Sequence, residues 1–149
     1  MKDQQMLKDF NEKFGFPIRT TPQVPSDEEV RQRCRLKVEE VFEMLIDALD
    51  RKNETHELKF LHDRIMGLIN RSAVRVNMVG VIDALADESY LLLGDAISFG
   101  VDMAPVLKLV HETNMKKLPA TTPGGKPIKP PGWKPPDIRS ELIRQGWKP

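Results

Sequence analysis

The chain has 149 residues, of which 40% are hydrophobic and 30% charged, and its net charge is +1. This length fits one domain with a modest core, and the near-neutral charge gives no basis for bulk electrostatic binding to nucleic acid. No run of about eighteen apolar residues is present, so we expect no membrane span. A single cysteine, Cys34, excludes an intrachain disulfide, and the polar start MKDQQMLKDF does not resemble a signal peptide. Both features predict a cytoplasmic protein.

Aromatic residues make up 6% of the chain and β-branched alternation is nearly absent, so the predicted fold class is all-α. The first helix is predicted over residues 4–14, where apolar residues recur at helical spacing, and Gly15 supplies its stop. Residues 16–25 contain three prolines and are predicted to be an extended connector.

A long helix is predicted from Ser26 to about Asp50. Ser26 followed three residues later by Glu29 is typical of a capping box, which satisfies backbone N–H groups at a helix start. The apolar residues of this helix fall in one narrow arc, as expected for a core-facing stripe. They are Val38, Val41, Phe42, Leu45 and Leu49.

Three glutamates of this helix, Glu39, Glu40 and Glu43, border the apolar stripe. At about 100° per residue, Glu39 and Glu43 lie beside the stripe and Glu40 roughly a sixth of a turn further out. A carboxylate there can be partly desolvated and still reach a cation. The same pattern is typical of a solvated glutamate face, so these acids alone leave both interpretations open.

Two further helices are predicted over residues 57–70 and 73–99, after a charged turn at 50–57. The second is apolar almost all the way round, which indicates a helix buried on several sides, in a bundle centre or a subunit interface. We therefore expect a homodimer or a homotetramer.

Two aspartates, Asp83 and Asp87, interrupt this apolar helix and share one of its faces. Because a buried unpaired carboxylate costs several kcal/mol, the pair should have a cation, either Arg, Lys or a metal. Glu88 and Asp95 form a separate acidic line, which we interpret as a place for solvent or for salt bridges between subunits.

Gly100 ends the apolar helix, and Asp102 offers an N-cap for a helix predicted over residues 104–117. The last turn, HETNMKK, presents Asn114 and Lys117 in a neutral and basic cluster that could meet an anion. A cationic last turn also complements the helix dipole, so ordinary helix termination is the alternative.

Residues 119–149 are predicted to be a Pro/Lys-rich arm, distinct from a helical domain over residues 1–118 and packing on it or on a neighbouring subunit. Seven prolines between residues 118 and 136 exclude a helix or a central strand and favour an extended, polyproline-like path. The same composition is typical of a disordered tail. A final short helix over 137–145 could pin the arm down.

The arm carries spaced cations, Lys126, Lys129 and Lys134, with Trp133 between the last two. Ammonium groups and one aromatic surface could lie over a nucleotide or a neighbouring subunit.

If the two acidic helices pack side by side, four or five carboxylates meet at one point, which only divalent cations make tolerable. Oxygen ligands without histidine or cysteine favour Mg²⁺ or Mn²⁺ over zinc. Mg²⁺ held by carboxylates most often serves a phosphate-bearing substrate.

At these residues the sequence resembles the MazG-like all-α nucleoside triphosphate pyrophosphohydrolases, and among them the small phosphoribosyl-ATP pyrophosphohydrolase-like proteins. The resemblance covers nearly the whole chain and rests on five segments in order: FNEKFGFP, RCRLKVEEVFE, DALADESYLLLGDAISFGVD, VHETNMKKL and GGKPIKPPGWKPPDI. It implies a bundle of four to five helices with an active site shared between subunits. The implied reaction cleaves a nucleotide between its α and β phosphates, releasing pyrophosphate and a monophosphate.

Carried onto this chain, the resemblance implies that Glu40, Glu43 and Asp87 bind the metal. Glu39 is then a further ligand or the base that activates the attacking water. Among phosphate-binding groups, the resemblance implies Asn114 and Lys117 after the last core helix, with the arm lysines Lys126 and Lys129 adding to them.

One departure from the family pattern concerns the fourth metal ligand. Many relatives have ExxD on the second acidic helix, whereas Ala84 stands here where that glutamate would be. Asp83, one residue earlier, is the candidate replacement. Water at that position or a lower metal affinity are the alternatives.

The expected function is therefore a Mg²⁺-dependent pyrophosphohydrolase of (deoxy)nucleoside triphosphates that cleans the nucleotide pool. Hydrolysis of phosphoribosyl-ATP is the alternative within enzymes. The alternative of another class is a non-catalytic helical assembly protein, with the acids paired to Arg31, Arg33 and Arg35 and the proline arm docking partners.

Overall fold

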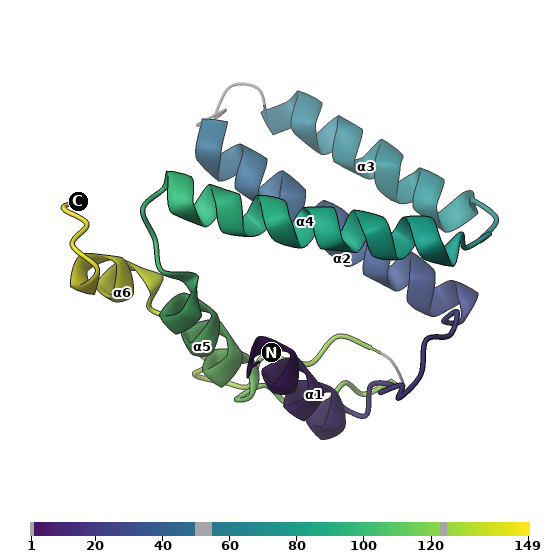
Figure 1. Ribbon diagram of the computed structural model, residues 1–149, viewed down its shortest axis with the longest axis horizontal. Helices are drawn as coiled ribbons and strands as arrows, with labels where there is room; N and C mark the ends of the chain where they lie inside the picture. The colour runs from purple at the N-terminus through teal and green to yellow at the C-terminus, as the bar shows by residue number, and fades with distance from the viewer. Residues whose placement is uncertain (1, 50–54, 123–124) are drawn as a thin grey trace. The chain divides into compact units, whose positions relative to one another are not determined.

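The computed structural model describes residues 2–49, 55–122 and 125–149. The described residues form six α-helices and contain no strand, which confirms the all-α class; five correspond to the helices predicted before residue 118 and the sixth to the short helix predicted over 137–145. In chain order they are α1 (Lys2–Phe14), α2 (Asp27–Leu49), α3 (Thr55–Arg71), α4 (Met78–Ser98), α5 (Met103–Asn114) and α6 (Ile138–Arg144) (Figure 1). The turn predicted at 50–57 lies largely outside the described residues.

The chain divides into two compact units. Met1–Pro22 and Ile82–Pro149 form the α5 unit, and Gln23–Val81 form the α2–α3 unit. The predicted division of the chain into a helical domain, residues 1–118, and an arm, residues 119–149, stays a prediction.

In the α2–α3 unit the two helices pack along each other (Figure 1). The predicted capping box at the start of α2 is confirmed: the Ser26 backbone N–H donates to Glu29 Oε2 at 2.9 Å, and the Glu29 N–H donates to Ser26 Oγ at 3.3 Å. Two such bonds fix the point where the connector becomes helix.

Two arginines fasten α2 to the end of α3. Arg35 donates to Glu28 Oε1 at 2.6 Å and to Asn70 Oδ1 at 3.0 Å, and Arg31 donates to the Ser72 carbonyl at 3.2 Å. The hydrogen bond from Arg35 lowers the pKa of the Glu28 carboxyl. These bonds join the N-terminal half of α2 to the C-terminal end of α3.

The predicted start of the apolar helix at residue 73 is wrong, because α4 begins at Met78. Asn77 precedes the helix, and its Oδ1 accepts a hydrogen bond from the Gly80 N–H at 3.2 Å, as an N-cap does. A side chain that bonds to the backbone in this way competes with continued helix upstream.

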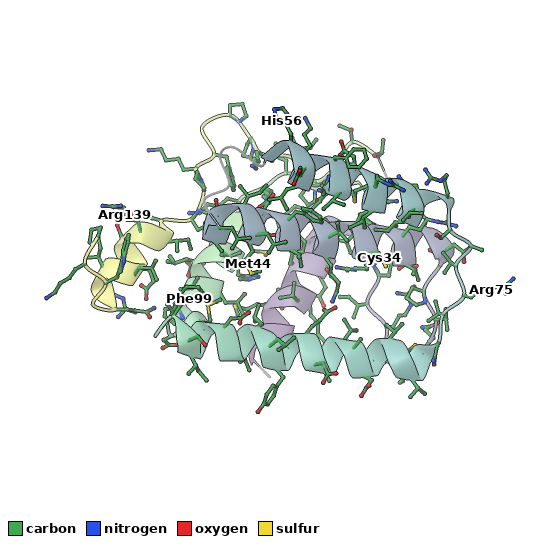
Figure 2. The ribbon with its side chains drawn as sticks, turned by 90° about the horizontal axis from the view of Figure 1, so that it is seen from above. Cys34, Met44, His56, Arg75, Phe99 and Arg139 are labelled. Carbon is green, nitrogen blue, oxygen red and sulfur yellow. The ribbon has the colours of Figure 1, made fainter. Side chains whose placement is uncertain are left out.

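Helix α4 is not buried within the single chain, and its predicted burial in a subunit interface stays a prediction. No residue of α4 is buried, and its large apolar side chains are strongly exposed. Tyr90 is 82% exposed and Ile97 79%. Phe99, just past the helix end (Figure 2), is 80% exposed. The helix pairs with the most extensive contact in the described residues are α2 with α3, α1 with α5, and α5 with α6.

In the α5 unit the helix boundaries follow the predicted signals closely. Gly15 and Gly100 have φ of 70° and 69°, the left-handed conformation that ends α1 and α4. Asp102 caps α5, accepting from the Ala104 N–H at 3.0 Å. Helix α5 ends at Asn114, three residues earlier than predicted, and Lys117 follows in a turn.

Helix α6 is docked on the start of α5 by one side chain. Gln145 accepts from the Asp102 N–H at 2.8 Å and donates to the Asp102 carbonyl at 3.0 Å. It also donates to Glu141 Oε1 at 2.8 Å, and Arg144 forms two hydrogen bonds to the same carboxylate. The Glu141 side chain is buried, with 9% exposed, and its carboxylate accepts hydrogen bonds from the charged Arg144 and the neutral Gln145.

This buried carboxylate predicts a specific acid sensitivity. Hydrogen bonds from Arg144 and then Gln145 lower the pKa of Glu141. Because its pKa is lowered, the ionised Glu141 carboxylate stabilises the fold by its full amount at pH values above the ordinary glutamate pKa, about 4.3. This stabilisation is lost as the pH falls through the lowered pKa. In melting experiments between pH 7 and 3, the melting temperature of wild type should therefore fall more steeply below pH 4.3 than that of Glu141→Gln. Parallel curves for the two proteins would contradict this role of Glu141.

Among the described residues, no single helix is long and apolar enough to cross a membrane. Helices α4 and α5 meet the length and composition only as a pair, which is bent by 113° at the break between them.

Candidate active site

The three candidate glutamates lie on one uninterrupted stretch of α2. Glu39 and Glu43 are one turn apart and share a face, with Glu40 on its border. Glu39 is half-buried, whereas Glu40 and Glu43 are exposed. This arrangement leaves carboxylate oxygens on the helix surface, beside the apolar side that meets α3.

The two candidate aspartates lie one turn apart on α4, and both are exposed. Asp83 and Asp87 belong to the α5 unit, whereas the three glutamates belong to the α2–α3 unit. The two acidic sets thus lie on different units, and their meeting stays a prediction.

The donor set fits a hard divalent cation in its chemistry. All five candidate ligands are carboxylates, the ligand type that Mg²⁺ and Mn²⁺ prefer. Within the part of the chain that the structure describes, however, no group of three or more His, Cys, Asp or Glu side chains is gathered so that it could hold a metal. Neither α2 nor α4 alone therefore supplies a complete metal site.

Two of the four candidate phosphate-binding residues are brought together by the fold. Lys117 follows α5 and Lys129 lies on the arm, and their Nζ atoms are 5.6 Å and 4.7 Å from the centroid of the Trp133 ring. Of the other two candidates, Asn114 is the last residue of α5 and is half-buried, and Lys126 lies exposed on the arm.

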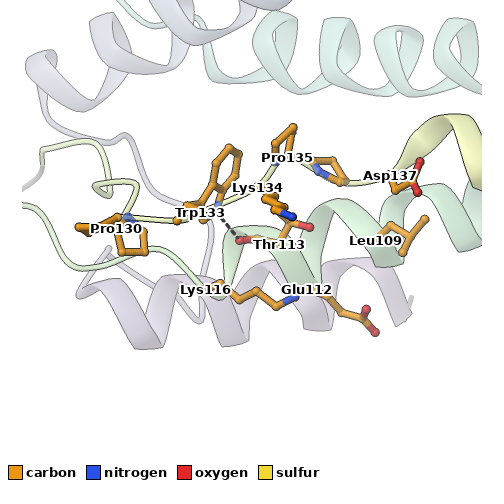
Figure 3. A pocket seen from close by; sticks show the side chains of 12 residues that line it. Leu109, Glu112, Thr113, Lys116, Pro130, Trp133, Lys134, Pro135 and Asp137 are labelled. Carbon is orange, nitrogen blue, oxygen red and sulfur yellow. Dashed lines mark hydrogen bonds between the residues drawn. The ribbon is translucent and has the colours of Figure 1, made fainter.

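Trp133 is held against the last turn of α5. Its indole N–H donates to the Thr113 carbonyl at 3.1 Å, and Thr113 is 7% exposed (Figure 3). A second link on the same arm is the antiparallel bridge between Leu118 and Ile128, with two backbone hydrogen bonds of 2.8 Å. The arm therefore returns to the end of α5 at two points.

The C-terminal end of α5 gathers positive charge from three segments. Lys13 of α1 donates to the Met115 carbonyl, Lys116 and Lys117 follow the helix, and Lys129 comes from the arm. Carbonyl groups at a helix end carry partial negative charge, which favours cations there. An anion that approached this end would meet several ammonium groups.

A hollow of about 490 Å³ separates α5 from the arm segment 130–137 (Figure 3). Its walls are the prolines of the arm and Leu109, and its charged groups are of both signs: Glu112, Lys116, Lys134 and Asp137. Trp133 and Thr113 also line this hollow, so it adjoins the positive cluster around Trp133.

Sequence reasoning placed Trp133 among cations but missed its bond to Thr113. The signal was present, because the last carbonyls of a helix lack intrahelical partners and an indole N–H usually finds an acceptor when it is partly buried. The carbonyl that accepts the hydrogen bond is set by the path of the arm, and the composition of the arm does not determine that path.

The sequence model of the phosphoribosyl-ATP pyrophosphohydrolase family matches residues 7–114. The chain belongs to this family. The resemblance to the MazG-like all-α pyrophosphohydrolases is thereby confirmed. The matched region includes the acidic parts of α2 and α4 and ends at Asn114, so the arm lies outside it.

A solved structure from Exiguobacterium sp. 255-15, provisionally assigned as an NTP pyrophosphohydrolase, is similar over almost its entire length. The two chains are 25% identical with a TM-score of 0.70, and the similarity covers 97% of this chain and 96% of the other. The arm therefore falls within the structural similarity. Among curated proteins none matches the chain.

Proposed function

We propose that this pyrophosphohydrolase is a Mg²⁺-dependent enzyme that cleaves (deoxy)nucleoside triphosphates between the α and β phosphates. The observation that carries the proposal is the family match over residues 7–114, because it spans both acidic helices, α2 and α4. All candidate ligands on these helices are carboxylates, as a Mg²⁺ site for a polyphosphate requires.

In this proposal Glu40, Glu43 and Asp87 hold the cation, with Asp83 in the place of the family's missing glutamate. Mg²⁺, when bound, supplies charge neutralisation on the phosphates and a lower pKa for water. The Glu39 carboxylate takes the proton of the attacking water. The water oxygen then bonds to phosphorus, the P–O bond between the α and β phosphates breaks, and pyrophosphate and a monophosphate leave.

Four cationic or amide side chains are assigned to the phosphates: Asn114, Lys117, Lys126 and Lys129. Negative charge accumulates on pyrophosphate as it leaves, and ammonium groups already in place stabilise that charge. The gathering of Lys117 and Lys129 at Trp133 supports this assignment.

The proposed enzyme is a homodimer or a homotetramer, with α4 packed against a second copy. An apolar helix whose large side chains remain exposed is unfavourable in water, since burial contributes about 25 cal/mol per Å². A second copy of the same chain is the simplest apolar partner, and it would bring a second set of acids from α4 to the site.

A nucleotide panel tests this function directly. Purified protein with Mg²⁺ should release pyrophosphate and the corresponding monophosphate from at least one deoxynucleoside triphosphate, as expected of an enzyme that cleans the nucleotide pool. The panel includes dUTP, dCTP, dATP, dTTP, dGTP, the ribonucleotides and phosphoribosyl-ATP. Release of orthophosphate instead, or turnover unaffected by removal of divalent cations, would contradict the proposal.

Phosphoribosyl-ATP itself is a second candidate substrate, favoured by the family that matches the chain. Turnover of phosphoribosyl-ATP alone in the same panel would select this function. A non-catalytic assembly role would instead give no turnover of any member and no rise in melting temperature with Mg²⁺ or Mn²⁺, because a cation that binds only the folded state stabilises it by mass action.

A further inference from the structure

We propose that Trp133 is a positioning residue that holds Lys117 and Lys129 for the phosphates of the substrate. This inference rests on the proposed function. We call these three residues the tryptophan–lysine cluster. It joins two segments that the sequence separates, the turn after α5 and the proline-rich arm.

The indole ring is fixed at a defined place before any ligand arrives. Its N–H donates to the carbonyl of Thr113, one of the most buried of the described residues, and this bond spans 20 residues of sequence (Figure 3). Lys117 lies four residues after Thr113. The Trp133 ring and Lys117 therefore both lie at the C-terminal end of α5.

The second lysine reaches the ring from the arm, four residues before Trp133. Both ammonium groups lie within the range of a cation–π interaction, at 5.6 Å for Lys117 and 4.7 Å for Lys129. The two nitrogens are thus no more than 10.3 Å apart, since their centroid distances add to that value.

The chemistry of the cluster suits recognition of a polyphosphate. The negative face of the ring attracts ammonium groups that would otherwise repel each other and sample many rotamers. An ammonium group has three N–H donors, so one that faces the ring keeps donors for phosphate oxygens. Lower rotamer freedom before binding reduces the entropy cost of binding.

The closest comparison within the chain is Trp147. It is 47% exposed, and its ring carries an arginine, Arg139, at 5.6 Å rather than two lysines. It is the only other tryptophan in the sequence. Trp147→Leu is therefore a matched control for loss of an indole with a cation on it.

The kinetic test uses Trp133→Leu, Trp133→Phe and Trp147→Leu, with folding checked by circular dichroism. Trp133→Leu should raise KM for the nucleotide, and the inhibition constant of pyrophosphate, by about tenfold with kcat within about twofold. Trp133→Phe retains a ring and should recover part of the loss. Trp147→Leu should match wild type. Unchanged KM and inhibition constants in folded Trp133→Leu would overturn the proposal.

A double-mutant cycle separates positioning from a general structural effect. In a Lys117→Met/Lys129→Met background, Trp133→Leu should add little to the rise in KM, because the groups that the ring holds are gone. If the effect of Trp133→Leu persists in full in that background, the ring acts by another route and the inference fails.

A binding experiment makes the outcome independent of turnover. In Trp147→Phe protein the tryptophan fluorescence, excited selectively over that of Tyr90, comes from Trp133 alone, and titration with inorganic pyrophosphate should change it in a saturable way. The change should be lost in Lys117→Met/Lys129→Met. A positive titration in a protein that turns over no nucleotide would refute the proposed function and retain the cluster, whereas a flat titration would refute the cluster.

Discussion

Glu40→Gln should reduce pyrophosphate release by about 10³-fold while leaving the fold intact. Glutamine keeps the shape of the side chain but loses the negative charge that a divalent cation needs. Glu40 is exposed on the surface of α2. Its replacement should therefore change the free energy of unfolding by no more than about 0.5 kcal/mol.

The matched control is Glu57→Gln on α3. Glu57 is an exposed glutamate of the same unit that has no place in the proposed site, so this variant should retain wild-type turnover. Melting curves of both variants show whether the fold is intact. Wild-type pyrophosphate release by Glu40→Gln would mean that the assignment of α2 is wrong.

Leu93→Glu on α4 should convert the oligomer to a monomer and remove most of the activity. Leu93 is 57% exposed in the single chain, and a carboxylate in an apolar interface costs several kcal/mol unless it is paired. Size exclusion with light scattering should give a mass of 17.0 kDa for the variant and two or four times that mass for wild type.

Val24→Glu is the control for this change, since Val24 is 55% exposed but lies in the connector before α2. It should keep both the mass and the activity of wild type. An active wild-type monomer, or an unchanged mass for Leu93→Glu, would contradict the role of α4 as an interface.

Local signals in the sequence predicted most of the helix boundaries. The capping box at Ser26, the cap at Asp102 and the left-handed glycines Gly15 and Gly100 depend on interactions within a few residues, so they can be read from spacing. The start of α4 was misplaced because its apolar periodicity begins before the helix does. The Asn77 cap was the signal that marked the true boundary.

Long-range features were harder to predict. The apolar character of α4 was correct, but a hydrophobic pattern does not say whether the partner lies in the same chain or in another copy. The bond from Trp133 to Thr113 and the docking of Gln145 on Asp102 depend on how loops return to the helices, which no local pattern specifies. The candidate acids could be named from spacing, whereas their meeting depends on packing between α2 and α4.

The central claim is that carboxylates of α2 and α4 hold one divalent cation against the substrate. Mn²⁺ binding, followed by electron paramagnetic resonance in wild type, Glu40→Gln, Asp87→Asn and the double variant, tests it most directly. If the two acids share one site, each single variant should weaken Mn²⁺ binding by about tenfold or more. The loss of Mn²⁺ affinity in the double variant should then be much smaller than the product of the two single losses. Wild-type Mn²⁺ affinity in Asp87→Asn, or independent losses that multiply in the double variant, would contradict a site shared by the two helices.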